Sequence, residues 1–246
     1  MRKLIRTLLI TSLITGFITL TSNAQEITWT SKSKAAKEWA KKGYVHYQNL
    51  ETEVAYEDFT KALEKDPNFT MVQFLMSRLS VGDTKKMYAD KARMSVANKS
   101  EGEKMFITLL DAKSVDEAHG IWSNLHTKFP DDAMSYYYYI ITMSDTTKVF
   151  DALTEYLQKY PSSPEAINNI AYLYLLDKKD TATAKKYFEK YIEVYPGGYN
   201  PYDSMGEFYY RIGDMVNSKK YYTQSLEHYP FCYTSRQKLE EFNKTK

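Results

Sequence analysis

Four histidines and one cysteine are the residues of this chain best suited to metal or nucleophilic chemistry. They are His46, His119, His126, His228 and Cys232. His119 and His126 stand seven residues apart, which on a helix separates them by roughly 10 Å along the axis. Zinc holds each imidazole nitrogen at about 2 Å, so these two histidines are too far apart to share one ion. The sequence therefore predicts no metal and no other cofactor.

Nucleophilic and acid–base chemistry find equally little support. Cys232 has no second cysteine with which to form an internal disulfide, and we interpret it as a small buried apolar residue; the alternative is a reactive or intermolecular thiol. The sequence lacks the HExxH, GxSxG and phosphate-loop motifs of common enzymes. Acidic residues are abundant, but nothing in their spacing selects a catalytic pair. We expect a protein that is not an enzyme.

The elements that carry these residues are helices, and prolines mark their ends. Five prolines recur at intervals of 63, 31, 35 and 34 residues: Pro67, Pro130, Pro161, Pro196 and Pro230. Proline lacks a backbone donor and disfavours helix in the residue before it, so each marks the end of a helix. Pro164 and Pro201 follow Ser163 and Asn200, where proline suits the first turn of a helix.

A second helix with one repeated pattern precedes each of the five prolines. Its three inward residues are spaced four and three apart: Ala55, Phe59, Ala62; Ala118, Trp122, Leu125; Val149, Leu153, Tyr156; Ala184, Phe188, Tyr191; Ser218, Tyr222, Ser225. This spacing places them on one helical face. Upstream, Trp39 with Gly43 and Tyr202 with Gly206 extend the pattern in the first and last units.

This pattern of prolines and inward residues resembles the tetratricopeptide repeat, a helix–turn–helix unit of about 34 residues. The resemblance implies an all-α fold, a right-handed α-solenoid of about six units over residues 36–246 that ends in a capping helix. Residues 36–69 and 199–232 match best, and residues 68–100 match least; their register is ambiguous, and Tyr88, Ala92 and Ser95 are one set of inward residues that fits it. Residues 25–35 are predicted to be an unstructured or loosely docked N-terminal lead-in, with Trp29 covering the first helix.

The first 24 residues have the pattern of a secretory signal peptide. Arg2, Lys3 and Arg6 precede a short apolar stretch, and Ala24 ends an A-x-A-like cleavage site. The alternative is a retained membrane anchor, but the uncharged stretch is shorter than the about 20 apolar residues that span a bilayer. No early cysteine is available to accept a lipid. We therefore predict a periplasmic or secreted protein without membrane insertion after cleavage.

The charge balance argues against nucleic acid as a partner. Cleavage leaves 30 Lys and Arg against 31 Asp and Glu, and no basic cluster stands out along the chain.

Nineteen of the 23 tyrosines lie after Pro130, including four in succession at 136–139. Such a run points around a helix in all directions, so we interpret it as packing rather than as one aromatic platform.

In tetratricopeptide arrays the first helices of successive units line a concave groove that holds a peptide or a partner helix. The helix period maps this groove to residues in three of the units. They are Lys37, Tyr44, Tyr47 and Gln48; Glu165, Asn168 and Tyr172; and Asn200, Asp203, Glu207, Tyr210 and Arg211. The positions that grip a C-terminal carboxylate in chaperone-binding members hold no Lys or Arg here, which argues against that type of ligand.

We therefore expect an exported scaffold or adaptor that binds a protein or peptide through its concave groove. One alternative is binding of carbohydrate or envelope glycan by the tyrosine-rich surface. Another is membership of an envelope assembly complex, against which the missing lipid-acceptor cysteine counts.

Overall fold

The computed structural model describes residues 26–244, and every regular element in this range is a helix. Six helix pairs follow one another along the chain: α1 (Lys34–Gln48) with α2 (Thr52–Lys65), α3 (Thr70–Leu79) with α4 (Gly82–Ser95), α5 (Glu101–Ile107) with α6 (Val115–Lys128), α7 (Ala133–Ile141) with α8 (Thr146–Lys159), α9 (Pro164–Leu176) with α10 (Thr181–Val194), and α11 (Asn200–Arg211) with α12 (Met215–His228). Helix α13 (Tyr233–Lys244) packs on the last pair. The predicted all-α solenoid of six units with a terminal helix is confirmed. The predicted signal peptide, residues 1–24, lies outside the described residues.

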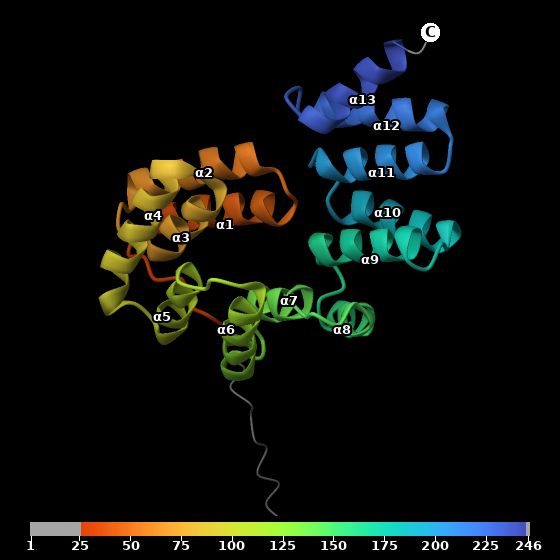
Figure 1. Ribbon diagram of the computed structural model, residues 1–246. Helices are drawn as coiled ribbons and strands as arrows, with labels where there is room; N and C mark the ends of the chain where they lie inside the picture. Colours follow the sequence, from red (N-terminus) through yellow and green to blue (C-terminus); the bar gives the residue numbers. More distant parts are fainter. Residues whose placement is uncertain (1–25, 245–246) are drawn as a thin grey trace, which may run out of the picture.

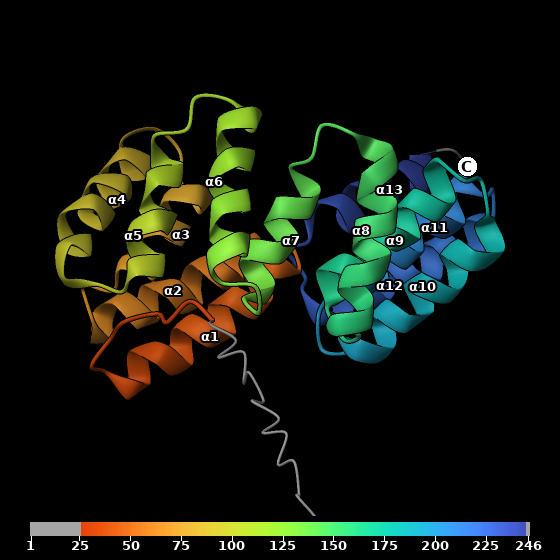
Figure 2. The ribbon, with the colours of Figure 1, turned by 90° about the horizontal axis from the view of Figure 1, so that it is seen from below.

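The solenoid curves back on itself. In Figure 1, α1–α4 lie on one side, α6–α8 run along the bottom, and α9–α13 rise on the other side. Figure 2 shows the same chain as two groups of helices with α7 between them. The turn between α1 and α2 faces the second group, so the first and last units approach each other across the concave side.

The predicted pattern of inward residues forms the packed face of the second helix in five of the six units, α2, α6, α8, α10 and α12. Each of these helices has 14 residues, and its fourth, eighth and eleventh positions face inward. Phe59, Phe188 and Tyr222 are almost completely buried at the eighth position. Glycine in the preceding helix makes room for Phe59 and Tyr222, because a Cβ on Gly43 would lie 2.7 Å from Phe59 and one on Gly206 would lie 2.7 Å from Tyr222. The two helices of each of these units therefore cross closely at the glycine.

Helix ends follow the sequence signals. Asp132, Asp180 and Asp214 are N-caps whose carboxylates accept hydrogen bonds from backbone N–H groups in the first turn. Ser100 and Glu103 have capping-box spacing and form the complete box at the start of α5. Ser114 caps α6, but the Glu117 carboxylate accepts from the Lys113 backbone N–H at 2.8 Å instead of closing the box.

The unit at residues 68–100, which matches the repeat least, has a different register from the one suggested by the sequence. Helix α4 begins at Gly82, so its fourth, eighth and eleventh positions are Lys85, Ala89 and Ala92, three residues earlier than Tyr88, Ala92 and Ser95. Ala89 and Ala92 are buried, whereas Lys85 is exposed. The signal was ambiguous because alanine fills positions that carry larger side chains elsewhere, and because no proline ends this helix. A short 3-10 helix, η1 (Val96–Asn98), follows it instead.

The lead-in is firmly docked, which corrects the prediction of a loose one. The Ile27 side chain is buried, and its backbone N–H donates to Asp132 at 3.2 Å. The Thr30 N–H donates to Glu103 at 3.0 Å. Trp29 stacks edge-on against Tyr44 of α1, with ring centroids 5.3 Å apart. Trp29 therefore covers the first helix as predicted, and the segment ties α1, α5 and α7 to one core.

Candidate functional site

Tyr44 and Tyr47, the predicted groove residues of α1, contribute to the core of the N-terminal half. Their rings are stacked 6.4 Å apart, and both pack against the buried cluster that α1–α7 share. Burial raises the pKa of Tyr44 well above its usual value, with nearby tyrosines and carboxyl groups adding to the shift. Tyr44 is therefore a neutral packing residue. Tyr47 also lines a cavity on the inner side of α3, α6 and α7.

The concave side is bridged near its middle, so it is not one continuous groove. The Gln48 side-chain amide, at the end of α1, donates a hydrogen bond of 2.8 Å to the Glu165 carboxylate at the start of α9. Glu165 is 6% exposed, and burial raises its pKa. This contact joins residues 117 positions apart and separates the space beside α3 and α7 from the space beside α9 and α11.

A larger contact between the first unit and the last two units adjoins this bridge. We call the set Asn49, Glu51, Tyr191, Tyr195 and Tyr199 the closure contact. The buried Glu51 carboxylate accepts from the Tyr199 backbone N–H at 2.7 Å and from the Tyr195 hydroxyl at 2.8 Å. The Tyr191 hydroxyl donates to the Asn49 side-chain oxygen at 2.9 Å. These bonds fix the α1–α2 turn against the α10–α11 connection.

The start of α11 provides the electrostatic reason for this contact. Glu51 lies where the first N–H groups of α11 have no partners within their own helix, and such a helix start favours a negative charge. His46 Nδ1 is 2.6 Å from the same carboxylate. A Cβ on Gly198 would lie 2.5 Å from the Glu51 oxygen and 2.0 Å from the Tyr195 ring. The close approach of the two units therefore requires glycine at 198.

Tyr199 of the closure contact also lines a cleft of about 330 Å³ between the two ends of the solenoid. We call it the C-terminal cleft. Its walls come from the α1–α2 turn, α9, α11 and the start of α13: Leu50, Thr52, Glu53, Asn168, Tyr172, Tyr199, Asn200, Asp203, Ser204, Glu207, Cys232, Tyr233 and Thr234. Asn200 and four other predicted groove residues, Asn168, Tyr172, Asp203 and Glu207, meet here.

Two of these four side chains already hold each other in place. The Tyr172 hydroxyl donates to a Glu207 oxygen at 2.9 Å, and the Arg211 Nε donates to the other Glu207 oxygen at 2.7 Å. Arg211 itself is exposed at the end of α11. Glu207 therefore contributes a carboxylate of fixed orientation to the cleft, while part of its charge is offset by Arg211.

Asp203 anchors the terminal helix. Its Oδ1 accepts from the Ser235 hydroxyl at 2.5 Å and from the Thr234 hydroxyl at 2.8 Å. The buried Cys232 thiol lies 3.7 Å from the same oxygen. Burial raises the pKa of Asp203, and these hydrogen bonds oppose that shift. The carboxylate thus joins α11 to α13, in addition to lining the cleft.

Asn168 is the one member of this group with an unsatisfied buried atom. Its side chain is 7% exposed, and its Oδ1 accepts no hydrogen bond from any residue between 26 and 244. A buried acceptor without a donor costs roughly 1–3 kcal/mol, so this oxygen favours a ligand that supplies an N–H or O–H group. Leu50 adds an apolar side chain, 65% exposed, held by a backbone with φ of +61°.

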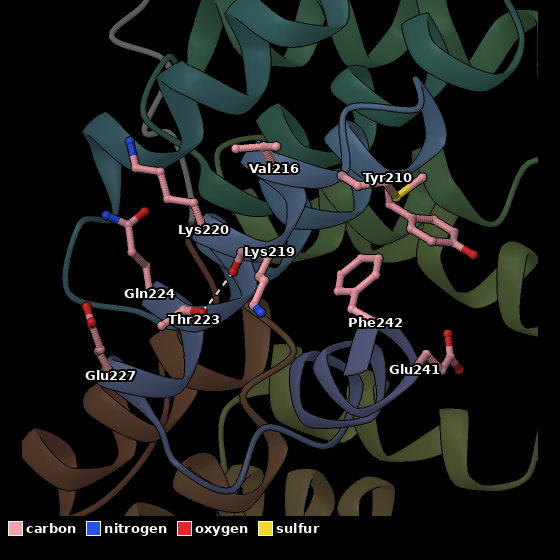
Figure 3. Close-up of a pocket in the computed structure, with 10 residues that line it drawn as sticks. Tyr210, Val216, Lys219, Lys220, Thr223, Gln224, Glu227, Glu241 and Phe242 are labelled. Atoms are coloured by element: carbon pink, nitrogen blue, oxygen red, sulfur yellow. Dashed lines mark hydrogen bonds between the residues drawn. The ribbon is translucent and has the colours of Figure 1, made fainter. Parts of the chain in front are cut away.

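Tyr210 faces a different surface from the other predicted groove residues. Lys238 of α13 lies over its ring at 4.5 Å, and the Phe242 ring is 6.0 Å away. Figure 3 shows the wide cleft of about 1080 Å³ that Tyr210 and Phe242 line with the outer residues of α12. This cleft lies at the terminal edge of the solenoid, and its other apolar lining residues, Met215 and Val216, are exposed.

Sequence reasoning missed the contributions of Leu50, Glu53, Tyr199 and the start of α13. The repeat pattern assigns residues to faces of helices, but these residues lie in turns or at helix ends. The pair Gly197–Gly198 was an available signal for a close approach. It did not indicate which distant segment approaches.

The described residues offer no alternative site of metal or membrane type. No group of three His, Cys, Asp or Glu side chains within 26–244 is arranged to hold a metal ion. None of the helices described is long and apolar enough to span a bilayer. The four tyrosines 136–139 each stack or pack against neighbouring rings.

The architecture defines a helical-repeat solenoid, and one family model matches its sequence. Residues 164–197, the pair α9–α10 and its connection, match the tetratricopeptide repeat. This match and the six helix pairs support the predicted likeness to the tetratricopeptide repeat, which the family model finds in this one unit. A search of curated protein sequences found no match.

Several solved structures are similar in fold. PilW, described as a type IV pilus biogenesis factor, is 13% identical over 84% of this chain and 99% of its own, with a TM-score of 0.48. PilF from Pseudomonas aeruginosa is 16% identical over 86% and 98%, with a TM-score of 0.44. YrrB, described as having an unusual peptide-binding site, is 12% identical over 83% and 92%, with a TM-score of 0.45. Similarities this distant do not define what the present chain binds.

Proposed function

We propose that this protein is an exported, non-catalytic scaffold that binds a segment of a partner protein in the C-terminal cleft. The observation that carries the proposal is the buried, unpartnered Oδ1 of Asn168 at the wall of that cleft. Solenoid repeats build extended concave surfaces that serve as binding sites. An extended peptide has backbone N–H groups at regular intervals, so one of them is a suitable donor to Asn168.

The charges of the cleft indicate a cationic partner segment. Glu53 is exposed at its rim, and Glu207 presents a carboxylate held by Tyr172 and Arg211. No Lys is among the residues that line it, and Arg211 is bound to Glu207 outside that lining. A Lys or Arg side chain in the partner would pair with Glu53 or Glu207, while Leu50 and Tyr233 would contact its aliphatic part.

Export is proposed from the N-terminal signal pattern, which precedes the described residues. Its direct test is the N-terminal sequence of the protein recovered from the cell envelope or the culture fluid. We expect the mature chain to begin at Gln25. A chain that starts at Met1 and sediments with membranes would support the retained-anchor alternative.

Binding is tested with a displayed library of random peptides selected on the folded chain 25–246. The selected peptides are expected to be enriched in Lys and Arg. Their affinities are then measured by calorimetry for Asn168→Ala and Glu53→Gln, with Asn124→Ala and Glu64→Gln as exposed controls of the same chemistry. Each cleft variant should weaken binding severalfold, because a hydrogen bond or an exposed charge pair contributes about 0.2–1.5 kcal/mol. Equal affinities for cleft variants and controls would refute the site.

A further inference from the structure

A second cavity of about 500 Å³ lies on the other side of the Gln48–Glu165 bridge. We call it the N-terminal cavity. Residues of α1, α3, α6 and α7 and of the segment before α6 surround it, so it belongs to the concave side of the first half. Its size is in the range of about 300–1,000 Å³ that is typical of sites for small organic molecules.

The inner walls of this cavity are apolar and rigidly packed. Phe74, Leu75, Trp122 and Met134 are each at most 6% exposed and line it. The Trp122 ring stacks on Tyr138 at a centroid distance of 4.7 Å and packs edge-on against Phe106. Such interlocked aromatic packing keeps the walls in one arrangement. The cavity is therefore preformed for an apolar body.

The rim combines apolar side chains with cations that lack partners. Val115 and Ile141 line the cavity and are 66% and 37% exposed. Arg78 of α3 and Lys113 also line it, and neither side chain has a hydrogen bond or ion pair with a residue in the described range. The nearby Glu117 carboxylate is 2.8 Å from the Lys113 backbone N–H, not from its ammonium group. No Asp or Glu lines the cavity.

We propose that the N-terminal cavity binds a small amphipathic organic anion, with an apolar body between Phe74 and Trp122 and a single carboxylate at Arg78. The guanidinium presents parallel N–H donors that match a carboxylate, and Lys113 adds a second positive charge at the mouth. This site is separate from the C-terminal cleft, and it does not depend on the function proposed for that cleft.

The probes for this site are decanoate and 4-phenylbutyrate, each compared with its neutral primary amide by calorimetry on the chain 25–246. The carboxylates should bind at least about tenfold more tightly than the amides, because a hydrogen bond to a charged group is stronger than one to a neutral group. Arg78→Gln should remove that difference and leave amide binding unchanged. Arg236→Gln, an exposed arginine on α13, is the matched control and should bind as the wild type does.

Tryptophan fluorescence locates the ligand, since Trp122 is in the cavity wall and Trp29 and Trp39 are elsewhere. We expect the carboxylates to change the emission of the wild type and not that of Trp122→Phe, in which circular dichroism verifies folding. Absent binding at millimolar concentration, or equal affinity for acid and amide, would overturn the proposal. Tighter binding of an acidic, leucine-containing peptide than of either free acid would overturn the assignment to a small ligand.

Discussion

The Glu51 carboxylate accepts a hydrogen bond of 2.7 Å from the backbone N–H of Tyr199, although 148 positions separate the two residues. This bond connects the first unit of the solenoid to the last one. Repeat solenoids are otherwise stabilised mainly by contacts between neighbouring units. Closure brings the α1–α2 turn to α9 and α11, and the C-terminal cleft lies between them, so neither unit forms this cleft alone.

Glu51→Gln is predicted to destabilise the fold and to loosen closure. Glutamine retains the size of the side chain but removes the negative charge at the start of α11. Its NH₂ group would also face a hydrogen-bond donor, the Tyr195 hydroxyl or the Tyr199 backbone N–H, where the carboxylate now accepts. The expected loss is about 1.5–3 kcal/mol, the range for hydrogen bonds to charged groups. Chemical denaturation measures the loss, and small-angle scattering should show a larger radius of gyration. An unchanged midpoint would contradict the role of the bond.

Gly198→Ala tests the same contact from the side of the α10–α11 connection. The added Cβ would overlap the Tyr195 ring and the Glu51 oxygen, and overpacking of this kind costs about 1–3 kcal/mol. Gly197→Ala is the matched control, since a Cβ there meets no atom within 4 Å. We expect Gly197→Ala to leave thermal stability unchanged or to raise it slightly. Equal effects of the two substitutions would mean that the segments do not approach closely.

Gly206→Leu tests the register of the best-formed unit. A side chain at 206 would press against Tyr222, which is 2% exposed and fills the crossing of α11 and α12. The predicted cost is about 1–3 kcal/mol. Gly120→Leu is the control on an exposed helical face, where the higher helix propensity of leucine should stabilise the protein. A thermal midpoint for Gly206→Leu equal to that of the wild type would show that the register is wrong.

Most of the fold could be predicted because it follows from the short-range spacing of apolar residues and prolines. The spacing of Ala184, Phe188 and Tyr191 and the prolines after each second helix are short-range signals, and they located five of the six units. The unit at 68–100 was harder, since Ala89 and Ala92 leave only a faint apolar stripe. Closure could not be predicted, because a single sequence does not record which distant turn meets Gly198.

The candidate site was predictable only in part for the same reason. The helix period selects Asn168, Tyr172, Asp203 and Glu207, and these residues of α9 and α11 line the C-terminal cleft. It also selects Tyr44 and Tyr210, whose environments depend on the docked lead-in and on α13. Those two segments lie outside the repeat, so its period carries no information about them.

Glu165 gives the fold a pH dependence of defined sign. Burial raises the pKa of its carboxyl in the folded state above the unfolded value, so folding is favoured more when this group is protonated. The stabilisation linked to protonation of Glu165 is complete below the pKa of this group in the unfolded state. It is lost as the pH rises through the pKa of the group in the folded state. Glu165→Gln should therefore be more stable than the wild type at pH 7, and the advantage should shrink towards pH 4. Denaturation of both proteins across that interval measures it, and an advantage that grew on acidification would contradict the sign.

The most direct test of the account is photo-crosslinking of a selected cationic peptide from position 50, at the rim of the C-terminal cleft. Position 216 is the control, because Val216 is also exposed but lines the outer cleft at α12 and α13. A benzophenone amino acid at position 50 should crosslink to the peptide, and the yield should fall in the presence of unlabelled peptide and in Asn168→Ala. Crosslinking from position 216 but not from position 50 would contradict the claim that closure of the solenoid builds the binding site.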